Sequence, residues 1–377
     1  MSPVYLDCNA TTPLDPAVRT VFLRFIDDEF GNAGSRTHAF GARAKAAVQR
    51  AREQVAAVVH CEKDEVIFTS GATESNNLAL LGLREEGERQ GRRHIIATAI
   101  EHKAVLEPLE HLGKNGFQVT LLPVNRQGIV SVEALQAALR PDTLLVSVMH
   151  VNNETGTIQP LAKVTQALKD HAAFLHVDAA QGFGKCLPDL KDTRIDLISL
   201  SGHKIYAPKG VGALIVRRRG YERLPLSPLI FGGGQERGLR PGTQPVALIA
   251  ALGEAAEQAA KHHKTRNQRC SKIKAAALNA LLAANGVPIG DPDQTVSSTL
   301  NIAFPGLDSE ALMVALKPLV AISNGSACTS QNYTASHVLV AMGLPAEQIN
   351  GALRLSWCHL TPEVAWSEVA EVIQTLR

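Results

Sequence analysis

Two neighbouring stretches, FLHVDAAQ at residues 174–181 and IDLISLSGHK at residues 195–204, decide how this chain folds. Each begins as an apolar run, which is typical of a strand buried on both faces. The first run ends at Asp178 and the second leads into Lys204. The pattern therefore predicts two strands of one buried sheet, with an acid and an amine beyond their carboxyl ends.

Apolar runs and helical patterns alternate around these two stretches. Further strands are predicted at 65–69, 94–98, 118–122, 144–148 and 212–216, with helices at 39–59, 72–83, 131–139 and 161–169 and another that opens at 101–103. Such alternation predicts an α/β fold with a parallel or mostly parallel sheet covered on both faces. Ligands of these sheets bind beyond the carboxyl ends of the strands. We expect residues 69–71, 99–102 and 150–154 to meet Asp178 and Lys204 there.

The turn SGAT at residues 70–73 joins a predicted strand to a predicted helix. Free backbone N–H groups and the positive end of the helix dipole form an anion site, and Thr73 adds a hydroxyl. A phosphate site near an acid and an amine suits pyridoxal 5'-phosphate (PLP), because the amine can condense with its aldehyde while the acid keeps the ring nitrogen protonated. The alternative is that Asp178 and Lys204 are only solvated or ion-paired, as most such residues are.

Composition excludes several classes of protein. The 377 residues are 45% hydrophobic and carry a net charge of +2, which favours a large and a smaller domain and gives no electrostatic case for direct nucleic-acid or membrane binding. The run 217–219, three arginines, is interpreted as the solvated end of a strand. The glycine-rich run 231–243 lacks a preceding strand with dinucleotide-binding spacing, so we interpret it as a flexible or subunit-crossing loop.

The six cysteines lie far apart and form no CxxC pair, which argues against a zinc ribbon or a disulfide framework. The first thirty residues hold four aspartates and no apolar core of signal-peptide length. We therefore expect a reduced, cytoplasmic location.

Seven motifs occur in the order of the longer-loop group of PLP-dependent cysteine desulfurases, which the chain resembles over nearly its full length. They are LDCNATT (6–12), TSGATESNN (69–77), EHK (101–103), HVNNE (150–154), HVDAAQ (176–181), SGHK (201–204) and GSAC (325–328). The resemblance implies a fold-type I aminotransferase architecture with a mostly parallel seven-stranded sheet. It further implies a homodimer that converts L-cysteine to L-alanine and keeps the sulfur as a protein persulfide. Residues 15–250 would form the PLP-binding domain, and residues 1–14 and 251–377 a small α+β domain carrying the catalytic cysteine.

The resemblance also implies roles for individual residues. Lys204 would hold the cofactor, Asp178 would pair with its ring nitrogen, Gln181 would bind the ring oxygen, and His102 would stack on the ring and move protons. The phosphate would be held by Ala72, Thr73, Ser201 and His203, joined by Thr243 of the partner subunit, and the substrate carboxylate by Asn153 and Arg354. Without the motifs, His102 could be a plain helix N-terminal residue and Arg354 a surface arginine.

Cys328 decides the reaction. It lies in a polar segment between a predicted strand and a predicted helix, whereas buried structural cysteines lie within apolar elements. Sulfur abstraction needs a thiol that reaches the substrate and then an acceptor, and a mobile loop permits both. We interpret the other five cysteines as structural, although relatives often carry asparagine where this chain has Cys8.

The RPGT sequence at 240–243 resembles the desulfurases that feed DNA phosphorothioation, where other relatives read RSGT. The sulfur acceptor is therefore expected to be a DNA-modification protein or an iron–sulfur scaffold. The main alternative is an aminotransferase or a selenocysteine lyase, which would share the PLP site but not require Cys328. A scaffold protein without chemistry would tolerate the loss of Lys204.

Overall fold

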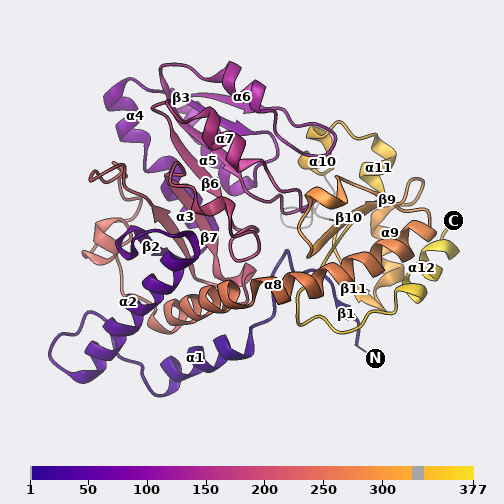
Figure 1. Ribbon diagram of the computed structural model, residues 1–377, viewed down its shortest axis with the longest axis horizontal. Coiled ribbons are helices and arrows are strands. Elements are labelled where there is room, and N and C mark those ends of the chain that lie inside the picture. The colour runs from indigo at the N-terminus through magenta and orange to yellow at the C-terminus, as the bar shows by residue number, and fades with distance from the viewer. Residues whose placement is uncertain (1, 325–334) are drawn as a thin grey trace.

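A seven-stranded sheet forms the centre of the larger part of the molecule (Figure 1). The computed structural model describes residues 2–324 and 335–377. The strands follow the order β2 (Val66–Thr69), β8 (Gly212–Val216), β7 (Leu197–Ser201), β6 (Phe174–Asp178), β5 (Thr143–Met149), β3 (His94–Thr98) and β4 (Gln118–Leu122). Only β8 runs antiparallel to its neighbours, β2 and β7. The prediction of an α/β fold with a mostly parallel sheet is confirmed.

Helices cover both faces of this sheet because alternate strand residues point to opposite sides. On one face, Val146 and Ile198 pack in a core shared with α2 (Ala39–Val59), α7 (Leu161–Ala167) and α8 (Val246–Ala283). On the other face, Leu145 and Leu197 pack with α3 (Ala72–Leu81) and α5 (Lys103–Lys114). Three more helices, α1 (Pro16–Asp27), α4 (Arg84–Gln90) and α6 (Val132–Ala138), complete this part of the chain.

A second core lies at the far end of the long helix α8 (Figure 1). Its antiparallel sheet has the order β12 (Ala352–Ser356), β10 (Thr299–Ala303) and β9 (Val287–Pro288). The helices are α9 (Ser309–Leu316), α10 (His337–Ala341), α11 (Ala346–Asn350) and α12 (Trp366–Thr375). The division at residues 14 and 250 stays a prediction.

The N-terminal strand β1 (Val4–Tyr5) pairs in parallel with β11 (Val320–Ala321), more than three hundred residues later in the chain. The sequence predicts a longer strand at 319–323, but only two of its residues have this partner. Leu6, which follows β1, packs in the same core as Trp357 and Ile373. The start of the chain is therefore part of the C-terminal core.

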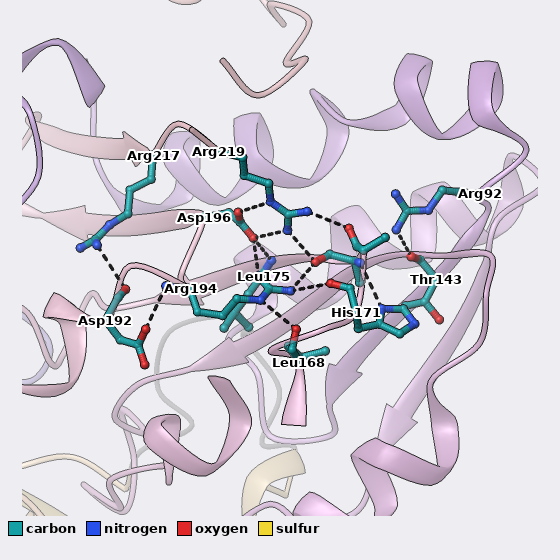
Figure 2. A network of polar contacts seen from close by, with 12 residues as sticks. Arg92, Thr143, Leu168, His171, Leu175, Asp192, Arg194, Asp196, Arg217 and Arg219 are labelled. Carbon is teal, nitrogen blue, oxygen red and sulfur yellow. Dashed lines mark hydrogen bonds and ion pairs between the residues drawn. The ribbon is translucent and has the colours of Figure 1, made fainter. Parts of the chain in front are cut away.

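The interpretation of residues 217–219 as a solvated strand end is wrong for Arg217, which is only 4% exposed. Its guanidinium donates to the carbonyl oxygens of Val59 at 2.7 Å and Leu190 at 2.8 Å. Arg219 is partly exposed but binds Asp196 through two nitrogens, Nε at 2.7 Å and Nη2 at 2.8 Å, and belongs to the network in Figure 2. Carbonyl oxygens of nearby loops and the buried carboxylate of Asp196 lie next to this run, and the arginines donate hydrogen bonds to them.

None of the helices in residues 2–324 and 335–377 combines the length and the apolar character needed to cross a membrane.

Candidate active site

A pocket of about 520 Å³ lies at the carboxyl ends of the central strands. This volume falls within the range of small-molecule sites. The predicted site residues that line it are Ala72, Thr73, His102, Asn153, Asp178, Gln181, Ser201, His203, Lys204 and Arg354. The structure therefore brings together ten of the twelve residues predicted from the sequence.

The remaining two have different outcomes. Thr243 is exposed and does not line this pocket, so its contribution from a partner subunit stays a prediction. Cys328 lies outside the described residues.

The turn before α3 is shaped as an anion site. Gly71 has a φ of +155°, which favours glycine, and it leaves the first amides of α3 without a side-chain cap. A Cβ on Gly212 of β8 would lie 2.6 Å from the Gly71 Cα, so β8 packs closely under the turn. The free amides at Ala72 and Thr73 are thus available to a phosphate, with Ser201 and His203 on the same pocket wall.

Asp178 ends β6 with its side chain held by two neutral donors. Its Oδ2 accepts from Asn76 Nδ2 at 2.7 Å, and its Oδ1 accepts from the backbone N–H of Ala180 at 2.9 Å. Asn76 is fully buried, and its own Oδ1 has no partner among residues 2–324 and 335–377. Asn76 is a functional residue that the sequence motifs do not single out, although an asparagine one turn after Thr73 on a helix covering an apolar sheet is a usable signal. Asn76 therefore fixes the orientation of this carboxylate at the pocket.

Lys204 lies just beyond β7, where the N-terminal segment crosses the pocket. Its Nζ donates to the backbone oxygens of Asn9 at 2.6 Å and Ala10 at 2.7 Å. Gln181 Nε2 also donates to Asn9 O, at 2.9 Å. Asn9 and Ala10 also line the pocket, which the sequence does not predict. They contribute backbone oxygens, and a sequence pattern shows only side chains.

Two pocket histidines are held in their neutral form. The pKa of His203 is lowered to about 4, mainly by burial and also by the charge of the neighbouring Lys204. Burial also lowers the pKa of His102, whose Nδ1 accepts from the backbone N–H of Ala104 at 3.1 Å. His102 is therefore a helix N-terminal residue, as the alternative held, and it also lines the pocket. Since its Nδ1 is an acceptor, its Nε2 carries the proton.

The residue before His102 is a fully buried acid. Burial raises the pKa of Glu101 to about 8, so this side chain is mostly protonated at neutral pH. Its Oε1 accepts from Thr98 Oγ1 at 2.6 Å and from the backbone N–H of Met149 at 2.7 Å. Glu101 thereby ties the segment carrying His102 to β5.

Arg354 lies in the middle of β12 and is only 3% exposed, so the surface-arginine alternative is wrong. Its Nη2 donates to Asp7 Oδ1 at 2.7 Å and its Nη1 to Asn153 O at 3.2 Å. Its Nε has no partner in the described part of the chain. A buried guanidinium that lines a pocket can bind a carboxylate there.

Comparisons with known proteins agree with this geometry. The model of the aminotransferase class-V family matches residues 4–363. A mitochondrial cysteine desulfurase of Arthroderma benhamiae is 43% identical over 377 residues, which cover 100% of this chain and 74% of the relative. The crystal structure of DndA from Streptomyces lividans superposes with a TM-score of 0.83 at 54% identity, covering 93% of this chain and 98% of that one. The structure of SspA in complex with cysteine gives a TM-score of 0.83 at 35% identity, covering 95% and 100% of the two chains.

The chain belongs to the class-V aminotransferase family, a group of PLP-dependent enzymes with the fold described above. Within that family it has the activity of a cysteine desulfurase. The pocket fits PLP, because it places amides for a phosphate, a buried carboxylate for the ring nitrogen and a lysine amine along one wall.

Proposed function

We propose that this enzyme removes the sulfur of L-cysteine, releases L-alanine and holds the sulfur as a persulfide on Cys328. The observation that carries the proposal is the convergence of Asp178, Lys204 and Arg354 on one pocket in a chain of this family. When bound, PLP supplies an electron sink for the bonds of the substrate α-carbon.

Side chains of the pocket would bind the substrate and transfer protons. Arg354 and Asn153 would hold the substrate carboxylate, since both line the pocket and are linked by a hydrogen bond. The neutral His102 would donate a proton from Nε2, while the amine of Lys204 would hold or release a proton near the α-carbon. Asp178 would hold the proton on the ring nitrogen, and Gln181 would bind the ring oxygen.

The segment that contains Cys328 is joined to the chain next to the pocket. On one side, the backbone N–H of Arg354 donates to Ser323 O at 2.6 Å. On the other, Ser336 Oγ donates to Glu154 Oε2 at 2.5 Å. Cys328 follows Asn324 by four residues, so chain length alone lets it lie anywhere within roughly 14 Å of that residue. These attachments support a thiol within reach of the substrate sulfur.

The proposal also covers the oligomeric state of the enzyme and the protein that accepts its sulfur. We propose a homodimer in which Thr243 of each subunit completes the phosphate site of the other, supported by the exposure of Thr243 outside its own pocket. The persulfide would pass to an acceptor protein of DNA phosphorothioation or of iron–sulfur cluster assembly, in the cytoplasm. Incubation with purified acceptors of each type and radiolabelled cysteine distinguishes the two.

Cys328→Ser tests the central step. The hydroxyl is nearly isosteric with the thiol but a poor nucleophile toward sulfur, so the variant should fold, keep its yellow cofactor and still bind cysteine. Alanine release should fall by more than about a thousandfold. Mass spectrometry of the wild-type enzyme after brief exposure to cysteine should show one extra sulfur on the peptide containing Cys328.

The matched control is Cys61→Ser, which changes a cysteine packed against the core of the large sheet and should leave turnover unchanged. Alanine release by Cys328→Ser at the wild-type rate, or an added sulfur on another cysteine, would contradict the proposal.

A further inference from the structure

Two cysteines that the proposed function does not use lie together where the N-terminal segment meets the segment after β12. Cys8 follows β1, and Cys358 follows β12 by two residues. The backbone N–H of Cys8 donates to Ser356 O at 3.0 Å, which brings the two segments side by side. Cys8, Cys358 and Tyr206 form one small buried cluster. The two thiols are therefore neighbours although they lie 350 positions apart in the sequence.

The surroundings of Cys358 favour its thiolate. The hydroxyl of Thr361 lies 3.7 Å from Cys358 Sγ as a donor, and the backbone N–H groups of Leu360 and Thr361 also donate to this sulfur. The hydrogen bond from the Cys8 thiol lowers the pKa of Cys358 and raises that of Cys8. Cys358 is thus the nucleophile of the pair, and Cys8 is the neutral partner beside it.

The pair opens onto a pocket of its own. This pocket has a volume of about 340 Å³ and is lined by Cys8, Cys358, Pro13, Leu360 and Pro362, among others. None of its lining residues lines the pocket that contains Lys204. Cys8 is 3% exposed and Cys358 is 1% exposed. Because so little of either thiol is exposed, we expect a reagent of about the size of a water molecule, roughly 30 Å³, to reach the sulfurs more readily than a bulky alkylating reagent.

We propose that Cys8 and Cys358 form a redox-active dithiol site whose substrate is a small hydroperoxide. The Cys358 thiolate attacks the peroxide oxygen, the O–O bond breaks, and the sulfur becomes a sulfenic acid as a hydroxide or alkoxide leaves and takes up a proton. The Cys8 thiol then attacks the sulfenic sulfur, forms the disulfide and releases water. Two thiols are oxidised, one peroxide is reduced, and an alcohol (or water) and one water are formed.

The site is linked to the pocket by the residues on either side of Cys8. Asp7 pairs with Arg354, and the backbone oxygen of Asn9 accepts from Lys204 and Gln181. A disulfide at Cys8 draws this short segment toward Cys358 and disturbs those contacts. The disulfide should therefore weaken the binding of cysteine, and a reductant should restore it. This consequence rests on the proposed function.

The test uses the PLP-loaded Cys328→Ser enzyme, so that the loop cysteine contributes no thiol. After treatment with hydrogen peroxide, tryptic digestion without reductant should yield peptide 355–377 linked to the N-terminal peptide that ends at Arg19, two hydrogens lighter than the sum. Dithiothreitol should separate them. With Cys8→Ser added, Cys358 should stop at the sulfenic acid, which dimedone should trap after the peroxide is removed and the protein is unfolded in urea. With Cys61→Ser added instead, the linked peptide should form as before.

A digest in which Cys358 stays unmodified, or in which other cysteines are joined, overturns the proposal. The link to the pocket is measured separately by spectral titration with L-cysteine, where oxidation should raise the dissociation constant at least fivefold and Cys8→Ser should abolish the change. An unchanged constant in the disulfide form overturns the link. Because none of these measurements uses the Cys328 persulfide, failure of the proposed function remains distinguishable.

Discussion

Two aspartates at the ends of neighbouring strands of the same sheet, Asp178 and Asp196, are almost equally buried but have opposite surroundings. Asp196 precedes β7 at the amino edge, where it binds the guanidinium groups of Arg194 at 2.9 Å and Arg219 at 2.7 Å (Figure 2). Asp178 ends β6 at the carboxyl edge and, within the residues that the structure describes, accepts from neutral amide groups. The protein thus neutralises the charge of one acid and leaves the other for a ligand. Burial alone does not separate a structural acid from a functional one, whereas the charge of its partners does.

The largest effect is expected at the carboxyl edge from Lys204→Ala. The variant should lose the yellow absorbance of lysine-bound cofactor and more than about a thousandfold in turnover, because the amine that condenses with the aldehyde is gone. Absorbance spectra and alanine release measure both. Lys209→Ala is the matched control, since Lys209 lines the same pocket but is exposed, and it should keep the band. Full activity of Lys204→Ala would refute the cofactor assignment.

Asp178→Asn should lower turnover by about a hundredfold while the cofactor is retained, because the carboxylate acts on the ring nitrogen and the phosphate is held at the start of α3. Stability should change by less than about 1 kcal/mol, since the amide removes a buried charge whose hydrogen bonds within the described residues come from neutral groups. Single-turnover kinetics and urea unfolding give the two numbers. A normal rate would show that the two aspartates do not differ in function.

Asp196→Asn should give the reverse result. Its amide can no longer neutralise Arg194 and Arg219, so the free energy of unfolding should fall by about 3 kcal/mol. Turnover per folded molecule should stay within about twofold, because the residue lies at the opposite edge of the sheet from the pocket. The comparison would fail if this variant were as stable as the wild type or lost activity while folded.

Glu101→Gln should produce the smallest effect, a change in pH dependence. The pKa of Glu101 is raised to about 8 in the folded state from 4.5, so the unfolded chain releases this proton first. The stability contributed by the protonated form is therefore complete below about pH 4.5 and is lost as the pH rises toward 8. In the glutamine variant this part of the decline should be absent. Urea unfolding at a series of pH values between 5 and 9 measures it, and parallel curves for both proteins would contradict the assignment.

The sheet could be predicted from sequence because its strands are short, continuous apolar runs. Three predicted strands, 94–98, 118–122 and 212–216, have the observed bounds. The placement of the candidate site at the carboxyl ends followed from the same pattern. The contacts that orient the site residues could not be predicted, because Asn76 meets Asp178 across 102 positions and Asn9 meets Lys204 across 195.

The arginines at 217–219 also show that contacts between residues far apart in the sequence could not be predicted. Residues 217–219 read as solvated when only neighbours in sequence are considered, yet Arg217 finds its carbonyl partners up to 158 positions away. The roles of Thr243 and Cys328 stay predictions, the first because it depends on a second subunit and the second because it lies outside the described residues.

The pairing of β1 with β11 has a consequence for how the enzyme is made. Asn9 and Asp7 are translated more than three hundred residues before the partners of this segment, residues 320–321 and Arg354. At roughly 5–20 residues per second, the first segment waits about 20–70 s for them. The nascent chain therefore cannot assemble the wall that receives the substrate until residues 320–354 have been translated. A chain truncated before β12 lacks Arg354 and so lacks part of the wall of this pocket.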